Sequence, residues 1–441
     1  MTRTLALAAA CLLAGLPSIA QPYCEDFLSE ETLPAKYRSL FPIVSDAGTG
    51  WIFTGDQLDA EYDLKPEALA LVGQIVTAFA DQGVPLAILM PPPRPSIAGQ
   101  AAFDATAGGR VGLDVEAADA SFSRMVQQVA QTGAIMPDLR AAMTRDEGLR
   151  GAYYFRRDTH WTPTGVVASA LVMAEAVAQR HPDLFPNAGT VLPSFPADVE
   201  MLDEPGSLSD VAEDVCGLRP EPEVAAVPVF PASGLGLLDG AASMPRIALV
   251  GTSFSDRRRR DYYRVADAMA GAFQADVDNF SVSGGGSASA MEVFALSGAF
   301  LRAEHDLVIW ELPYTENLSS ISTLRQVLGA LDLARSQPGG AAMSLDRTGR
   351  MVLPLGGGDP DLVVVKTPGG TPDYVTIDVR FEDGSATSLT LRRKGDFPPD
   401  LSSAEASLSV SDQGKDIAEI EARYDIASTG TQATIELRSL R

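Results

Sequence analysis

Apolar residues recur at helical spacing in the first two thirds of the chain, and short apolar runs separate these stretches. Between positions 66 and 81 the apolar positions fall on one helix face, at Leu69, Val72, Ile75, Val76 and Phe79. Gly83 follows this stretch, and the next apolar run, at 84–90, has the length of a buried strand. The pattern therefore predicts a helix that is followed by a strand of a central sheet.

The same alternation continues along the chain. It predicts further helices at 115–131, 162–180, 256–271 and 325–336, and further strands at 134–136, 246–250, 275–282 and 306–311. Helices that alternate with short apolar strands are typical of an α/β domain with a largely parallel central sheet. In such sheets the reactive groups lie at the C-terminal ends of the strands.

Two regions depart from this pattern. Residues 183–243 are rich in proline, glycine and acidic residues and have little periodicity, which predicts a loop-rich insertion. From residue 339 to 441, short alternating runs are separated by Gly, Pro and Asp. This pattern predicts a small all-β sandwich, with the domain boundary at 337–340. The α/β domain is then predicted to occupy residues 21–338.

The first 20 residues predict a signal peptide. Arg3 precedes an apolar stretch that is too short to span a bilayer, and Ser18-Ile19-Ala20 has the small residues of a cleavage site. A lipid anchor at Cys11 is the less favoured alternative, because little apolar sequence precedes it. Export leaves Cys24 and Cys216 in an oxidising compartment, where they are a candidate disulfide, and two unpaired thiols are the alternative.

The formal net charge of −24 argues against nucleic acid or an anionic membrane surface as a partner. No nucleotide or coenzyme motif is visible, so no cofactor is predicted. The chain has only three histidines, and none lies at a spacing to another, or to a cysteine, that predicts a metal site. His181 and His305 are predicted to lie on the surface.

Two short motifs carry the candidate chemistry. Asp158-Thr159-His160-Trp161 precedes a predicted helix, and Gly251-Thr252-Ser253-Phe254-Ser255 follows a predicted strand. A serine, a histidine and an aspartate form a nucleophile system in which the base activates the hydroxyl and the carboxylate orients the base. The motifs therefore predict a serine-dependent acyl transferase or esterase, with Ser253, His160 and Asp158 as the catalytic residues.

Each motif also has an ordinary structural interpretation. The serine motif alone also fits a helix N-cap, with Ser255 as an alternative cap or nucleophile, and the histidine alone fits a buried structural residue. If Ser253 opens the next helix, its free backbone N–H is one oxyanion donor. The sequence leaves several candidates for the second oxyanion donor. They are the backbone N–H groups of Gly284-Gly285-Gly286, with Gly285 at the centre, and the side-chain amides of Asn279 and Asn317.

Other residues near the motifs are candidates for substrate binding. Four adjacent arginines, 257–260, follow Ser253 and predict an anion site, with Arg257 and Arg258 as its members, although a solvated helix face fits them equally well. Tyr314 lies just after a predicted strand, and Trp161 lies beside the candidate base, where it packs on the ring or lines the cleft.

These residues resemble the SGNH-hydrolase-like domain of periplasmic alginate O-acetyltransferases of the AlgX/AlgJ type. That family has an Asp-Thr-His-Trp-type motif followed by a Gly-Thr-Ser-Tyr/Phe-Ser motif, which match residues 158–161 and 251–255 here. The segments Trp51 to Asp56 and Ile309 to Pro313 resemble two further family segments. The resemblance covers residues 24 to about 335. The AlgX type also has a C-terminal carbohydrate-binding β-domain and an N-terminal disulfide, which the predicted sandwich and Cys24 with Cys216 would match.

The resemblance implies a periplasmic enzyme that transfers an acetyl group through Ser253 to hydroxyls of an exported anionic, alginate-like polysaccharide. It implies an acetyl donor delivered by a membrane partner, and contacts with proteins of an export complex. Positive charge for the polymer would come from the arginine run and from basic residues of the C-terminal domain: Lys366, Arg380, Arg392, Arg393 and Lys394. Two alternatives remain, namely a secreted carbohydrate acetylesterase with the same three residues and a non-catalytic polysaccharide-binding scaffold.

Overall fold

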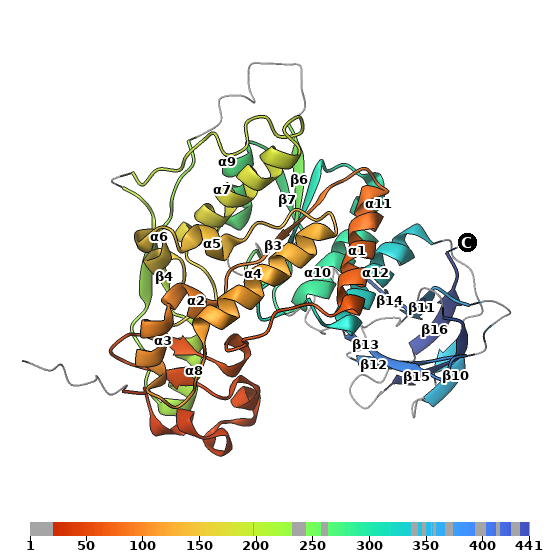
Figure 1. Cartoon of the computed structure of the whole chain (residues 1–441), viewed down its shortest axis with the longest axis horizontal. Coiled ribbons are helices and arrows are strands. Elements are labelled where there is room, and N and C mark those ends of the chain that lie inside the picture. Colours follow the sequence, from red (N-terminus) through yellow and green to blue (C-terminus); the bar gives the residue numbers. More distant parts are fainter. Residues whose placement is uncertain are drawn as a thin grey trace, which may run out of the picture.

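The chain consists of two domains in the computed structural model (Figure 1). We call residues 44–336 the α/β domain and residues 343–440 the β-domain. The model describes residues 21–196, 198–231, 244–256, 263–316, 318–336, 343–345, 350–353, 355, 359–366, 374–392, 403–411, 415–424 and 433–440. The predicted signal peptide and the predicted boundary at 337–340 lie outside these residues.

A four-stranded parallel sheet forms the centre of the α/β domain. Its order is β3-β8-β6-β7, and the strands are β3 (Leu86–Leu89), β8 (Leu307–Glu311), β6 (Arg246–Val250) and β7 (Asp276–Asn279). All residues of β3 and β8 are buried, as expected for strands that are covered on both faces. The predicted strand at 134–136 is only a single parallel bridge between Ile135 and Ala87.

Helices cover both sides of this sheet. Figure 1 shows α7 (Pro163–Arg180) and α9 (Val265–Phe273) on one side, and α1 (Pro66–Ala80), α10 (Gly286–Leu296) and α12 (Ile321–Arg335) on the other. The remaining helices of this layer system are α2 (Arg94–Ala98), α3 (Gln100–Ala107), α4 (Val115–Gln131), α5 (Leu139–Met143), α6 (Glu147–Ala152) and α11 (Ala299–Arg302). The predicted helix at 256–271 corresponds to α9, which begins only at Val265.

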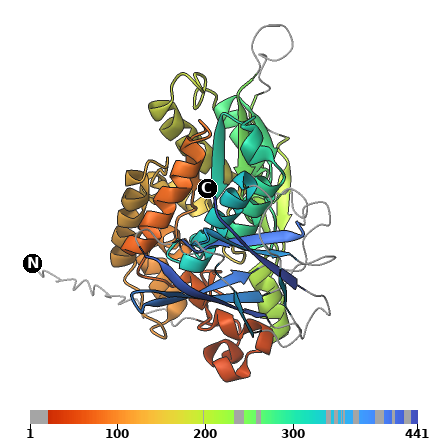
Figure 2. The same cartoon turned by 90° about the vertical axis from the view of Figure 1, so that its right-hand side faces the viewer.

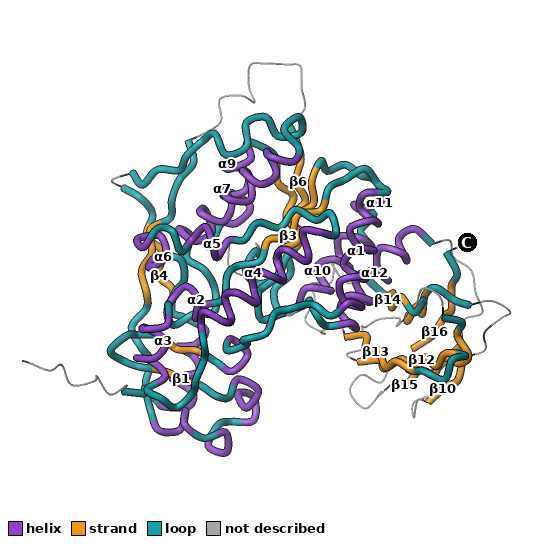
Figure 3. Tube along the Cα trace, viewed as in Figure 1, coloured by secondary structure: helices purple, strands orange, loops and turns teal. Residues whose placement is uncertain are grey.

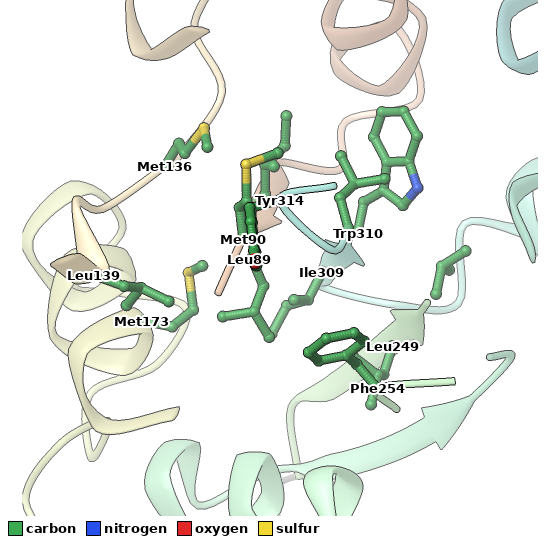
Figure 4. Close-up of a cluster of buried hydrophobic side chains, with 14 of the residues drawn as sticks. Leu89, Met90, Met136, Leu139, Met173, Leu249, Phe254, Ile309, Trp310 and Tyr314 are labelled. Carbon is green, nitrogen blue, oxygen red and sulfur yellow. The ribbon is translucent and has the colours of Figure 1, made fainter. Parts of the chain in front are cut away.

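The core lies where strands and helices meet. Leu89, Ile309 and Leu249 come from three neighbouring strands and gather there with Leu139 and Met173 of the helices (Figure 4). All five side chains are buried. This packing fixes the C-terminal ends of β3, β8 and β6 relative to one another.

The insertion at 183–243 is more ordered than its composition predicts. It contains the hairpin of β4 (Met201–Glu204) and β5 (Glu223–Ala226), with α8 (Ser207–Cys216) between the two strands. Residues 232–243 lie outside the described part of the chain. Helix α8 was not predicted because it is short and half of its residues are polar, so its sequence resembles that of a loop.

The N-terminal segment, residues 21–45, packs on α8. It forms three short 3₁₀ helices, Glu25–Leu28, Glu30–Thr32 and Ala35–Leu40, and β1 (Val44–Ser45), which pairs with β2 (Ile52–Phe53). Phe27 and Leu33 share a small core with Leu208 and Val211 of α8. The predicted disulfide between Cys24 and Cys216 is confirmed and closes a separation of 192 residues.

The β-domain consists of two four-stranded antiparallel sheets, β10-β15-β12-β13 and β14-β11-β16-β9. Its strands are β9 (Met343–Leu345), β10 (Arg350–Leu353), β11 (Leu362–Lys366), β12 (Tyr374–Phe381), β13 (Ala386–Arg392), β14 (Glu405–Ser409), β15 (Ile417–Tyr424) and β16 (Ala433–Arg438). Coloured by secondary structure, this region contains strands and loops alone among its described residues (Figure 3). Buried residues at alternate positions, such as Val375, Ile377 and Val379, form its core.

Helix α12 joins the two domains. A Cβ atom at Gly329 would meet the Ser407 carbonyl oxygen and the Ser409 nitrogen at 2.8 Å, so glycine is required for the helix to approach β14 this closely. Gln326 donates a hydrogen bond to the Arg392 carbonyl at 3.0 Å and accepts one from the Arg392 N–H at 3.2 Å. Figure 2 shows the β-domain from its own side, with its blue strands in front of the α/β layers.

Candidate active site

Ser253, His160 and Asp158 form one chain of hydrogen bonds. The Ser253 Oγ lies 2.9 Å from the His160 Nε2, across 93 positions of sequence, and the His160 Nδ1 lies 2.6 Å from the Asp158 Oδ1. Ser253 follows the C-terminal end of β6, and the other two residues lie just before α7. The parallel topology therefore brings together the three side chains that the two motifs predict.

The Asp158 carboxylate is fully buried but remains ionised. Burial by itself raises its pKa, but the charge of His160 and hydrogen bonds from His160 and Ser207 lower the pKa well below its usual range. The carboxylate accepts a hydrogen bond from the His160 Nδ1–H, and in the tautomer with its proton on Nδ1 the Nε2 lone pair faces Ser253. This tautomer lets Nε2 accept the proton of the Ser253 hydroxyl.

Helix α8 supplies a further contact to this carboxylate. The Ser207 N–H, at the first position of α8, donates to the Asp158 Oδ2 at 2.5 Å, and the His160 N–H donates to the Oδ1 at 2.7 Å. The positive end of a helix stabilises a nearby anion. The sequence prediction missed Ser207, because its segment was taken for a loop.

Aromatic rings hold the imidazole in place. The Tyr263 ring stacks on His160 with centroids 5.2 Å apart, and the Phe254 ring lies at 4.7 Å. Trp161 is completely buried, and its Nε1–H donates to the Phe254 carbonyl at 3.1 Å. The prediction that Trp161 binds substrate is therefore wrong, because its indole is buried and its N–H is bonded to the turn that carries Ser253.

Ser253 lies on a tight turn, not on the first turn of a helix as predicted. The turn closes with a hydrogen bond from the Ser255 N–H to the Thr252 carbonyl at 3.0 Å. A Cβ atom at Gly251 would lie 2.5 Å from the Glu311 Oε2, so only glycine permits this approach. Glu311 in turn accepts the Thr252 N–H at 2.7 Å and the Thr252 hydroxyl at 3.1 Å. The buried carboxyl of Glu311 therefore anchors the residue that precedes Ser253.

A cavity of about 250 Å³ opens at the Ser253 hydroxyl. Its wall contains Asp56, Gln57, Thr159, Gly284, Gly286, Tyr314 and Glu316. Tyr314, which is predicted to bind substrate, lies in this wall. Gly285 lines a neighbouring cavity of about 280 Å³, whereas Gly284 and Gly286 line that of Ser253.

Asn279 does not face the cavity as an oxyanion donor. Its Nδ2 donates to the Ser255 carbonyl at 2.7 Å, and its Oδ1 accepts the Ser281 N–H at 2.9 Å. Both bonds tie the amide to the loops behind Ser253, and Asn279 is not among the residues that line the Ser253 cavity. Arg257, Arg258 and Asn317 lie outside the described residues.

The surface prediction for His305 is also wrong. Its side chain is buried, and its Nε2 lies 2.9 Å from the Asp278 Oδ2. Within the described residues, no three His, Cys, Asp or Glu side chains are grouped in a way that would bind a metal ion. None of the described helices is both long enough and apolar enough to cross a membrane.

Protein stability should depend on pH through Glu311. Burial raises the pKa of this carboxyl to about 8, against the opposing hydrogen bonds from Thr252. The folded state then keeps a proton that the unfolded chain loses near pH 4.5, so stability decreases as the pH rises toward 8. We expect Glu311→Gln to flatten this decrease in melting temperature, measured by scanning calorimetry across this range. The exposed Glu31→Gln is the control, and equal slopes for wild type and Glu311→Gln would contradict the expectation.

The fold and the site together define an SGNH-hydrolase-like protein: a parallel sheet with a Ser-His-Asp chain of hydrogen bonds at its C-terminal edge. The family model described as the SGNH hydrolase-like domain of the acetyltransferase AlgX matches residues 44–314. This match covers more than half of the chain, and the protein belongs to this family. The predicted family, the α/β fold with a parallel sheet and the C-terminal all-β sandwich are thereby confirmed.

Individual relatives agree with this assignment. The alginate biosynthesis protein AlgX of Pseudomonas syringae pv. tomato is 28% identical over 375 residues, which cover 81% of this chain and 72% of that protein. The probable alginate O-acetylase AlgJ of Pseudomonas putida is 28% identical over 251 residues, which cover 52% of this chain and 60% of that protein. The solved structure of AlgX from Pseudomonas aeruginosa covers 94% of this chain and 99% of its own, with a TM-score of 0.70 and 20% identity, and shows the same fold.

Proposed function

We propose that this protein is an O-acetyltransferase that carries an acetyl group on Ser253 and delivers it to hydroxyls of an exported anionic polysaccharide of the alginate class. The observation that carries the proposal is the chain of hydrogen bonds from Ser253 through His160 to Asp158, which ends at an open cavity. The names of the relatives, which refer to alginate biosynthesis and alginate O-acetylation, support the choice of group and polymer.

The first half-reaction transfers the acetyl group from the donor to Ser253. The Ser253 Oγ attacks the carbonyl carbon of the donor ester while the His160 Nε2 takes the hydroxyl proton. The bond between that carbon and the leaving oxygen then breaks, and His160 returns the proton to the leaving group. Asp158 keeps the imidazole in the required tautomer and stabilises its charged form.

The second half-reaction transfers the acetyl group from Ser253 to the polysaccharide. A sugar hydroxyl attacks the acetyl carbon, His160 takes the proton of that hydroxyl, and the bond to the Ser253 Oγ breaks. Ser253 then regains its proton from His160. No metal or coenzyme is needed for either step, because both are acyl transfers between oxygen atoms.

The described cavity wall is acidic, since it contains Asp56 and Glu316. A polyanionic acceptor would therefore need positive charge beside the cavity. Arg392 lines the neighbouring cavity, whereas Lys366 and Arg380 are paired with glutamates of the β-domain. Together with the arginine run at 257–260, Arg392 is the candidate for binding the polymer. We further propose a periplasmic location, a membrane partner that delivers the acetyl group, and association with export-complex proteins.

Acetyl transfer is tested by incubating the purified protein with an aryl acetate as donor and with oligomannuronate as acceptor. Mass spectrometry should show an acetyl group on the oligosaccharide, and on Ser253 when the acceptor is omitted. A neutral cello-oligosaccharide of equal length is the matched acceptor and should gain less acetyl. Release of acetate alone would identify a carbohydrate acetylesterase, and binding of the oligosaccharide without any ester turnover would identify a scaffold. Either result would overturn the proposal.

A further inference from the structure

Gln57 is a polar residue of the Ser253 cavity that neither half-reaction uses. It ends the short 3₁₀ helix η4 (Gly55–Gln57), which follows β2, and only 1% of its surface is exposed. It directly follows Trp51 to Asp56, one of the family-like segments for which the sequence suggests no chemical role. In the structure, Gln57 and Ser253 line the same cavity.

The orientation of the Gln57 amide is fixed by Arg94. The Arg94 Nη1 donates to the Gln57 Oε1 at 2.6 Å. An arginine can only donate, so the atom that faces it must be the amide oxygen. Arg94 is itself immobile, because it is fully buried and also donates to the carbonyls of Ile52, Phe155 and Arg156 at 2.8–3.0 Å.

The amide nitrogen of Gln57 then has two N–H groups to place. Among the described residues it has no hydrogen-bond acceptor within the protein. A nearly buried amide donor without a partner costs free energy unless a bound molecule or water accepts from it. Since Gln57 lines the cavity, a substrate bound there is the candidate acceptor for these donors.

The reaction needs such a donor. When the Ser253 Oγ attacks an ester, negative charge develops on the carbonyl oxygen, and preorganised N–H groups stabilise it. The Asn279 amide is already used by two backbone groups, and Gly285 lies in the neighbouring cavity. Gln57 therefore combines a fixed amide orientation with a place at the cavity, which Asn279 and Gly285 do not line.

We propose that the Gln57 side-chain amide, held by Arg94, donates a hydrogen bond to the acetyl carbonyl oxygen of the acyl group at Ser253. This inference rests on the proposed acyl transfer and adds a catalytic residue to it. It also assigns a role to Arg94, which acts as a positioning residue through Gln57.

Two variants separate donation from structural support. Gln57→Leu removes both the donor and the acceptor for Arg94. Gln57→Glu keeps the acceptor, and even strengthens the contact with Arg94, but replaces the N–H donors with an oxygen. We expect both variants to lower kcat for aryl acetate turnover by about 100-fold, with KM nearly unchanged, because the lost bond acts in the transition state. Gln57→Glu should also keep the melting temperature of the wild type.

The matched control is Gln128→Leu. Gln128 is a half-buried amide on α4 that accepts the Leu64 N–H at 3.0 Å and is not among the residues that line the cavity. This variant should leave kcat unchanged. The inference is overturned if Gln57→Glu retains wild-type kcat, or if the variants raise KM alone. These results leave the proposed function standing as long as Ser253→Ala is inactive. Full turnover by Ser253→Ala would overturn both.

Discussion

Ser253→Ala should lower kcat for ester turnover by about 10⁶-fold, because the proposed mechanism carries the acetyl group on the Ser253 Oγ. Loss of a serine nucleophile leaves only the contribution of substrate binding and oxyanion donors to the rate. The Ser253 hydroxyl bonds to His160 and is partly exposed, so its removal should hardly change the melting temperature. The measurement is steady-state turnover of an aryl acetate, together with mass spectrometry for the acetyl-enzyme.

Ser255→Ala is the matched control for this prediction. Ser255 lies two residues further along and is a second serine of the same motif, but it is buried. Its variant should keep most of the turnover and should still show acetylation at Ser253. Loss of activity in Ser255→Ala with retention in Ser253→Ala would assign the nucleophile to the other serine.

Asp158→Asn should lower kcat by about 10⁴-fold, as loss of the orienting carboxylate does in serine proteases. An asparagine has one oxygen for a position where three hydrogen-bond donors converge, from the His160 ring, the His160 N–H and the Ser207 N–H. Its NH₂ group would face at least one of these N–H groups and could not accept a hydrogen bond from it. Where the NH₂ group faces the ring, Nδ1 must accept a hydrogen bond, so the ring proton moves to Nε2. The imidazole would then present the wrong tautomer to Ser253.

The same substitution should lower stability at neutral pH. Since the folded-state pKa of Asp158 is depressed, its ionised form stabilises the fold above the unfolded-state pKa of about 4, and this contribution is lost as the pH falls through the folded-state value. Calorimetry at neutral pH should therefore show a lower melting temperature for Asp158→Asn than for the exposed control Asp203→Asn. A variant within tenfold of wild-type kcat would contradict the assigned role of Asp158.

Local periodicity was sufficient to predict much of the fold. Helices such as α4 and α7 lie within one residue of the predicted bounds, because each has a continuous apolar stripe and clear end signals. The strands with long apolar runs, β3, β6 and β8, were likewise visible. Helix α9 begins at Val265, whereas the prediction placed its start at residue 256, and residues 257–262 of that prediction lie outside the described part of the chain.

The sequence predicted those parts of the site whose residues lie close together along the chain. Asp158 and His160 are two residues apart, so their pairing could be read from the sequence. Ser207, Gln57 and Glu311 reach the site through tertiary contacts, and no local pattern reports such contacts. Only Glu311 had a signal, namely an acidic residue at the end of a strictly apolar strand, where an ionised group is costly.

Trp161 and Asn279 show the opposite error. Each is a residue type that often serves in active sites, and each instead donates a side-chain N–H to a backbone carbonyl. Composition shows that such a group is available, but only the packing shows whether it is free. The same reasoning favours Gln57, whose donors lack a partner among the described residues.

Helix α12 limits how this protein can be divided. Residues 324–333 are all buried, because one flank of the helix belongs to the α/β core and the other touches β14. A truncation after Ser336 would expose that second flank to water, which favours aggregation. Exchange of the β-domain between related proteins should therefore succeed only when the outward residues of α12 are exchanged with it. The unit of modular recombination is then the sandwich together with its supporting helix.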